Sequence, residues 1–115
     1  MPAPSPLAIS TSSVERLLKE ERSYHAELAE QQARAEALSK IPTEKDDDGN
    51  AEFLLKQQRA VVEQTRAVFK PLRMRIREAV AKLEELIAQE EGEGEDLVRA
   101  RAVLERARKA EDGRA

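Results

Sequence analysis

The sequence predicts an all-α protein: an elongated, coiled-coil-like bundle of three helices that run up, down and up, with a proline kink in the middle helix. Ala (18), Glu (18), Arg (13), Leu (12) and Lys (7) account for 68 of the 115 residues, a composition typical of long helices. Apolar residues recur at alternating steps of three and four along three segments, which short polar stretches separate. The chain has room for one domain, and aromatic residues make up only 3%, so we expect a thin core between the helices.

The first helix is predicted over about residues 12–40. Three prolines and several small residues indicate an extended or disordered arm over residues 1–11. Ser12 followed by Glu15 matches a capping box, which marks a helix N-terminus. The row predicted to face the core is Val14, Leu17, Glu21, Tyr24, Leu28, Gln31, Ala35 and Leu38. Two residues of this row are polar, so we expect the face to be water-accessible or to meet a partner rather than to form a fully dry seam.

A charged surface loop is predicted after the first helix. Pro42 ends that helix, and residues 44–50 combine charged side chains with Gly and Asn, which tolerate unusual backbone angles. Three adjacent aspartates in this loop resemble calcium ligands, but the alternating ligands and the terminal glutamate of an EF-hand loop are missing. No metal site is therefore predicted in the loop.

The second helix is predicted over about residues 50–90. Its core row is Leu55, Gln58, Val62, Thr65, Phe69, Leu72, Ile76, Ala79, Leu83 and Leu86. A flanking row of Leu54, Val61 and Val68 widens the apolar face, as expected of a middle helix that touches two neighbours. Pro71 lies inside this pattern, where a proline costs a helix about 3 kcal/mol. Because the spacing does not slip at Pro71, we expect one long, kinked helix rather than two.

A shorter third helix is predicted over about residues 95–110, after a break that contains two glycines. Its apolar residues are Leu97, Ala100, Val103, Leu104, Ala107 and Ala110. Residues 112–115 are expected to fray. The three helices are expected to form a single bundle domain over residues 12–111.

The sequence contains no pattern for catalysis or for a bound cofactor. It has no cysteine, and its single histidine, His25, follows Glu21 by four residues, which does not complete a zinc site. A nucleophile beside a base, paired carboxylates in a pocket and a phosphate-binding glycine loop are also missing. No run of ten apolar residues occurs, so a membrane span is not expected. We therefore predict a protein that is not an enzyme and that uses no cofactor or metal.

Charge is strongly segregated along the predicted second helix. Residues 56–77 contain seven Lys or Arg and one Glu, whereas residues 78–96 contain eight acidic residues and one Lys. The basic side chains recur at steps of three and four, one position after the apolar row, so they should face outward. Neighbouring like charges repel by roughly a few tenths of a kcal/mol, so this basic stripe indicates either a solvated face or an acidic partner. The basic stripe comprises Lys56, Arg59, Arg66, Lys70, Arg73 and Arg77.

Three sets of residues carry a family resemblance. In the first helix and its lead-in they are Ile9, Thr11, Val14, Arg16, Leu17, Lys19, Glu20, Tyr24, Glu27, Gln31 and Gln32. In the second helix they are Asn50, Lys56, Gln57, Gln58, Val62, Gln64, Thr65, Pro71, Arg75, Ala79 and Leu83. In the third helix they are Arg101, Val103 and Leu104. In order and spacing, these residues resemble the tubulin-binding cofactor A family, also called tubulin-specific chaperone A, and the internal proline is the most specific element.

The resemblance implies a three-helix bundle that captures β-tubulin folding intermediates after their release from the cytosolic chaperonin and passes them toward α/β-heterodimer assembly. It implies a cytoplasmic, cytoskeleton-associated monomer or homodimer, with β-tubulin and the other tubulin-folding cofactors as partners. The residues that look architectural are Leu17, Tyr24, Val62, Pro71, Ala79 and Leu83. The exposed matches that could meet tubulin are Arg16, Lys19, Glu20, Gln32, Lys56 and Gln57. The basic stripe adds Arg59, Arg66, Lys70 and Arg73 as an electrostatic guide for an acidic β-tubulin surface.

Two other functions fit parts of the sequence pattern. A structural or adaptor coiled coil would homodimerise through the first helix, along the row from Val14 to Leu38. A helical nucleic-acid-binding module would use the basic stripe of the second helix. The isoelectric point of about 5.4, the acidic segment beside the stripe and the lack of base-stacking aromatic residues argue against nucleic acid as a partner.

Overall fold

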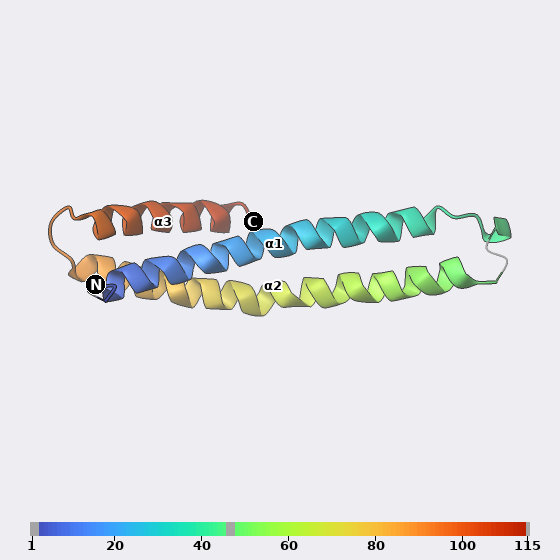
Figure 1. Cartoon of the computed structure of the whole chain (residues 1–115), viewed down its shortest axis with the longest axis horizontal. Coiled ribbons are helices and arrows are strands. Elements are labelled where there is room, and N and C mark those ends of the chain that lie inside the picture. Colours follow the sequence, from blue (N-terminus) through green and yellow to red (C-terminus); the bar gives the residue numbers. More distant parts are fainter. Residues whose placement is uncertain (1–2, 46–47, 115) are drawn as a thin grey trace. The chain divides into compact units, whose positions relative to one another are not determined.

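The computed structural model of the chain describes residues 3–45 and 48–114, which form helices and short connections (Figure 1). Helix α1 spans Pro6–Ser39, η1 is a 3₁₀ helix over Thr43–Lys45, α2 spans Asn50–Gln89 and α3 spans Glu95–Asp112. The prediction of an all-α fold with three helices is confirmed. Of the loop predicted at 44–50, residues 46–47 lie outside the described part of the chain. None of the described helices is both long enough and apolar enough to cross a membrane.

The chain divides into two compact units. The three-helix unit comprises Met1–Glu21 and Leu72–Ala115, and the two-helix unit comprises Arg22–Pro71. In the three-helix unit, α3 lies beside the first part of α1 and the last part of α2 (Figure 1). The two-helix unit pairs the rest of α1 with the first part of α2. The single domain predicted over residues 12–111 stays a prediction.

Helix α1 begins at Pro6, not at Ser12, so the prediction of an extended arm is wrong for this part of the chain. Ser5 acts as the N-terminal cap, because its Oγ accepts a hydrogen bond from the backbone N–H of Ala8 at 3.0 Å. Pro6 then occupies the first helical position, where proline loses no helical hydrogen bond. Leu7 and Thr11 are buried in the three-helix unit, and their burial holds this extra turn of helix in place.

The core of the three-helix unit follows the rows predicted for α2 and α3. On α1 the prediction is wrong at one step, because Leu18 is buried and Leu17 is only half-buried. Leu72 and Leu83 of α2 are fully buried, and so is Val14 of α1. Burying one such side chain contributes about 1.5–3 kcal/mol. Every residue predicted for the apolar row of α3 except Ala110, which is half-buried, is buried: Leu97, Ala100, Val103, Leu104 and Ala107.

The core of the two-helix unit is thinner. Val62 and Phe69 of α2 are buried, and the ring of Tyr24 meets Phe69 edge-on with a centroid distance of 6.4 Å. Gln31 is also buried, and its backbone carbonyl accepts a hydrogen bond from Gln58 at 3.2 Å. The strip buried between the two facing helices is therefore narrow, and it contains polar as well as apolar side chains.

The flanking row of α2 lies in the two-helix unit, where α1 is the one other α-helix among the described residues, so the expectation of two neighbours within its unit is corrected; Val68 is half-buried. Leu54 and Val61 are 40% and 36% exposed. Helix α3 instead contacts the opposite flank, where Arg77 pairs with Glu111 at 3.4 Å. Val61 precedes a core residue of α2 and Arg77 follows one, so the two lie on opposite sides of the core row.

Pro71 is an exposed residue inside α2, and the helix continues through it. The prediction of one long helix rather than two is therefore confirmed. The kink at Pro71 stays a prediction.

Candidate functional site

Four residues of the basic stripe lie in the two-helix unit, and all four are exposed. Arg66 pairs with Glu63 on the same helix at 2.8 Å. In the described part of the chain, Lys56, Arg59 and Lys70 form no ion pair. These three cations therefore face outward, as the sequence predicts for the stripe, and their role in binding stays a prediction.

A groove runs beside the stripe between the two helices of the two-helix unit, and we call it the Arg59 groove. It is lined by Gln32, Ala35, Glu36 and Ser39 of α1 and by Arg59, Val62, Glu63 and Arg66 of α2. An adjoining hollow shares Arg59 and is lined by Gly49, Glu52, Phe53, Leu55 and Lys56. Four predicted partner-binding residues thus meet in one place: Gln32, Lys56, Arg59 and Arg66.

The other side of the two-helix unit carries a second hollow without charged residues. It is lined by Leu38, Leu54, Gln57, Gln58, Ala60, Val61 and Gln64. Of the predicted partner-binding residues, this hollow contains Gln57 alone. The structure therefore separates Gln57 from its chain neighbour Lys56, since consecutive helical residues point about 100° apart.

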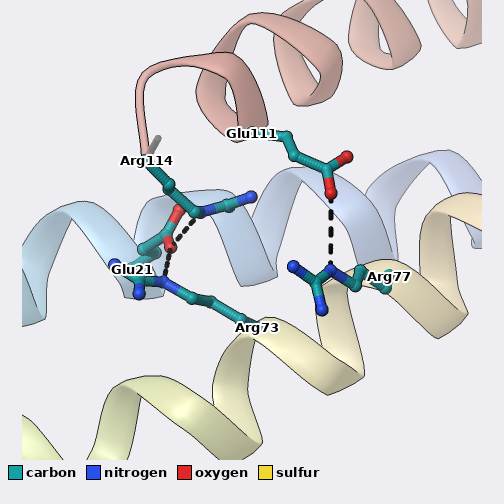
Figure 2. A network of polar contacts seen from close by, with 5 residues as sticks. All are labelled: Glu21, Arg73, Arg77, Glu111 and Arg114. Atoms are coloured by element: carbon teal, nitrogen blue, oxygen red, sulfur yellow. Dashed lines mark hydrogen bonds and ion pairs between the residues drawn. The ribbon is translucent and has the colours of Figure 1, made fainter.

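Arg73 does not face outward, which corrects the prediction for this end of the stripe. Its Nε lies 3.4 Å from Oε2 of Glu21, in the three-helix unit (Figure 2). The side chain of Glu21 is only 7% exposed, so the expectation of a water-accessible position is also wrong. Arg77 is likewise paired, through its Nε, with Glu111 at 3.4 Å (Figure 2).

The main partner of Glu21 is Arg114, just beyond the end of α3. Its Nε and Nη2 donate to the two carboxylate oxygens of Glu21 at 2.7 and 2.5 Å (Figure 2). Arg114 lies in the segment that the sequence predicts to fray, so that prediction is wrong for this residue. One signal pointed to it: a glutamate in a core-facing row is buried, and a buried carboxylate requires a cation.

Ion pairing shifts two pKa values at this cluster. Burial raises the pKa of Glu21, but hydrogen bonds and charges from Arg114 and Arg73 outweigh burial and bring the pKa below its ordinary value. The hydrogen bond to Glu21 in turn raises the pKa of Arg114. Both shifts mean that the folded chain favours the ionised pair.

A second carboxylate on α1 joins α3 in the same way. Glu15 pairs with Arg106 at 3.0 Å and with Arg99, which also donates to Ser12. The hydrogen bond from Arg106 is the main reason that the pKa of Glu15 is lowered, against the effect of burial. Ser12 and Glu15 therefore lie within α1 and bind residues of α3. They do not form the predicted capping box.

Acidification should destabilise the protein because Glu15 and Glu21 have lowered pKa values in the folded state. The unfolded chain then binds protons first, so the stabilisation is complete above about pH 5 and decreases as the pH falls through about 4 toward 3. Urea unfolding across this range should show a smaller loss for Glu21→Gln than for the unsubstituted chain. Equal losses would contradict the assignment to Glu21.

The remaining predicted residues are distributed between the units. On α1, Arg16 and Lys19 are exposed and Glu20 is half-buried. Of the residues predicted to be architectural, Val62 and Leu83 are buried, Leu17, Tyr24 and Ala79 are half-buried, and Pro71 is exposed. Their roles stay predictions.

The described residues offer no metal site, because they contain no group of three or more His, Cys, Asp or Glu side chains placed to hold an ion. The ring of His25 instead lies 4.5 Å from that of Phe69. The two-helix unit instead carries a groove whose charged lining residues are Glu36, Arg59, Glu63 and Arg66.

Comparisons with known proteins give two positive findings. The family model described as tubulin binding cofactor A matches residues 2–104. A solved structure, the crystal structure of tubulin folding cofactor A from Arabidopsis thaliana, is similar with a TM-score of 0.76 and 27% identity. That similarity covers 90% of this chain and 92% of the plant chain. Comparison with curated proteins gives no significant match.

Proposed function

Because the chain belongs to the tubulin binding cofactor A family, we propose that it captures β-tubulin folding intermediates after the cytosolic chaperonin and passes them toward α/β-heterodimer assembly. The family consists of tubulin folding cofactors, which are chaperones and not enzymes. The observation that carries the proposal is the family match over residues 2–104, nearly the whole chain. The partners are β-tubulin and the other folding cofactors of the pathway, in the cytoplasm and at the cytoskeleton.

The exposed cations of the two-helix unit support a role in guiding the client. Lys56, Arg59 and Lys70 carry positive charge with no ion pair among the described residues. A surface of one sign accelerates encounter with a surface of the opposite sign, and this effect weakens as salt screens it. We infer that these residues attract an acidic surface of β-tubulin.

Capture of purified β-tubulin by the purified chain tests the proposal. Reversal of Lys56, Arg59 and Lys70 to Glu should weaken capture at low salt by about tenfold or more, because attraction becomes repulsion. Arg73 is left unchanged in this variant, since its reversal would place a second carboxylate beside Glu21.

The matched control reverses three other exposed cations that form no ion pair in the described part of the chain: Arg75, Lys82 and Lys109. This control changes the net charge by the same amount and should retain capture. Equal loss of capture in both variants would show that net charge, and not the position of these three cations, attracts the client. Failure of the unsubstituted chain to capture β-tubulin would contradict the proposed function itself.

The alternative of a coiled-coil adaptor receives no support from the geometry. It requires the row from Val14 to Leu38 for dimerisation, but Val14 is fully buried within the three-helix unit. Toward the other end of the row, Gln31 is buried in the two-helix unit. A sedimentation measurement that returned a dimer separable only on unfolding would favour the adaptor.

A further inference from the structure

We propose that the Arg59 groove holds one helix of the captured client, with an apolar stripe toward the groove floor and acidic side chains along the edge that faces α2. This inference rests on the proposed function and extends it to the site and chemistry of contact. It is drawn from how the three-helix unit binds its own third helix.

In the three-helix unit, α3 shows what this kind of groove accepts. Its apolar row is buried, and both of its edges form ion pairs. On the edge toward α2, Glu111 pairs with Arg77 and Arg108 pairs with Glu84. On the edge toward α1, Arg99 and Arg106 pair with Glu15. A helix is therefore held by an apolar seam with charge pairs at its borders.

The part of α2 in the two-helix unit carries cations at positions equivalent to those of α2 in the three-helix unit. Lys70 precedes Arg77 by seven residues, and Arg59 precedes Arg73 by fourteen. A step of seven residues returns to nearly the same face of a helix. Arg77 pairs with Glu111 of α3 and Arg73 pairs with Glu21 of α1, whereas Arg59 and Lys70 form no ion pair among the described residues. In the described part of the chain, Lys70, the counterpart of Arg77, therefore lacks the carboxylate that the third helix supplies in the other unit, and a bound helix would supply it.

The floor of the groove suits a helix. Val62 lies at the bottom with 6% exposure, and Ala35 and Ser39 on α1 are small enough to let a backbone approach. At the adjoining hollow, Phe53 is 57% exposed beside Arg59. Phenylalanine and arginine are both enriched at protein–protein interfaces relative to the rest of a protein surface.

The α1 wall distinguishes a client helix from the third helix of a second copy. At this wall, Glu36 already pairs with Lys40 at 3.7 Å, and the other lining residues are uncharged. The α3 helix carries arginines on its edge toward α1, which would find no open carboxylate here. The expected occupant is therefore acidic toward α2 and uncharged toward α1.

Site-directed cross-linking tests this inference cleanly, because the chain contains no cysteine. Single variants Gln32→Cys and Ser39→Cys place a photoreactive maleimide label in the groove. Gln57→Cys and Gln64→Cys place the same label in the uncharged hollow on the other side. All four positions are exposed, so labelling should be equally efficient.

With β-tubulin as the probe, we expect cross-links from the groove labels and few from the control labels. The cross-linked client peptide should come from a helix with an acidic edge. Adding Arg59→Glu should reduce the yield about tenfold, because loss of a charge pair of that size corresponds to about 1.4 kcal/mol.

Three outcomes would overturn the inference. Cross-links mainly from the Gln57 and Gln64 labels, with capture intact, would move the site and leave the proposed function standing. A product of twice the chain mass would make a second copy the occupant. Absence of capture by the unlabelled chain would contradict the proposed function, and the inference with it.

Discussion

Replacement of Glu21 by glutamine should lower the free energy of unfolding by about 3 kcal/mol at neutral pH, the lower end of what breaking a buried ion pair costs. Glu21 and Arg114 are both almost completely buried, with 7% and 10% of their side chains exposed. The substitution removes the charge that compensates Arg114 and weakens both of its hydrogen bonds. Arg73, at 34% exposure, can still reach water, so we take the lower end of the range. Urea unfolding followed by circular dichroism measures the change.

Removal of the Arg114 side chain should lower the free energy of unfolding by less, because Glu21 keeps a second cation. In Arg114→Ala, Glu21 keeps Arg73 at 3.4 Å, and we expect a loss of about 1–2 kcal/mol. The matched control is Arg77→Ala, which breaks an ion pair that is 65% and 54% exposed and should cost less than about 1 kcal/mol. Figure 2 contains both pairs.

A double variant separates the role of charge from that of packing. Glu21→Leu with Arg114→Met replaces the buried pair by apolar side chains and should come close to the original stability, as such replacements often do. An unchanged free energy of unfolding in Glu21→Gln alone would show that the pair contributes nothing. A double variant as unstable as the single one would assign the loss to shape and not to an uncompensated charge.

The sequence predicted the helices well wherever one face is strictly apolar. In α3, the steps of three and four place Leu97, Leu104 and Ala107 in the core, as found. In α2, the unbroken spacing from Leu55 to Leu86 carried the prediction across Pro71, and the helix indeed continues. Periodicity works in these segments because one neighbouring surface determines which residues are buried.

The sequence did not predict features that depend on distant partners. The start of α1 at Pro6 depends on a serine cap and on the burial of Leu7, and neither follows from proline content. Arg73 and Lys70 belong to the same stripe, yet only Arg73 has a buried carboxylate opposite. Local spacing cannot reveal this difference. The Arg59 groove was likewise only partly predictable, since its cations come from α2 but its other wall comes from α1.

Replacement of Pro71 by alanine should raise the free energy of unfolding by about 2 kcal/mol. A proline inside a helix costs about 3 kcal/mol through a missing hydrogen bond and a clash with the preceding turn. Alanine restores an N–H at residue 71 but also frees the unfolded chain, which offsets up to about 1 kcal/mol. Because Pro71 is exposed, its ring leaves no cavity behind.

Thermal unfolding and β-tubulin capture, measured on the same Pro71→Ala protein, decide what the proline does. Gln64→Ala, an exposed site on the same helix, serves as the control and should change stability by less than about 0.5 kcal/mol. A fall in stability would show that the packing around residue 71 requires the local geometry of proline. A rise in stability with weaker capture would mean that α2 keeps an unfavourable residue because the client binds the helix only in the shape that proline imposes.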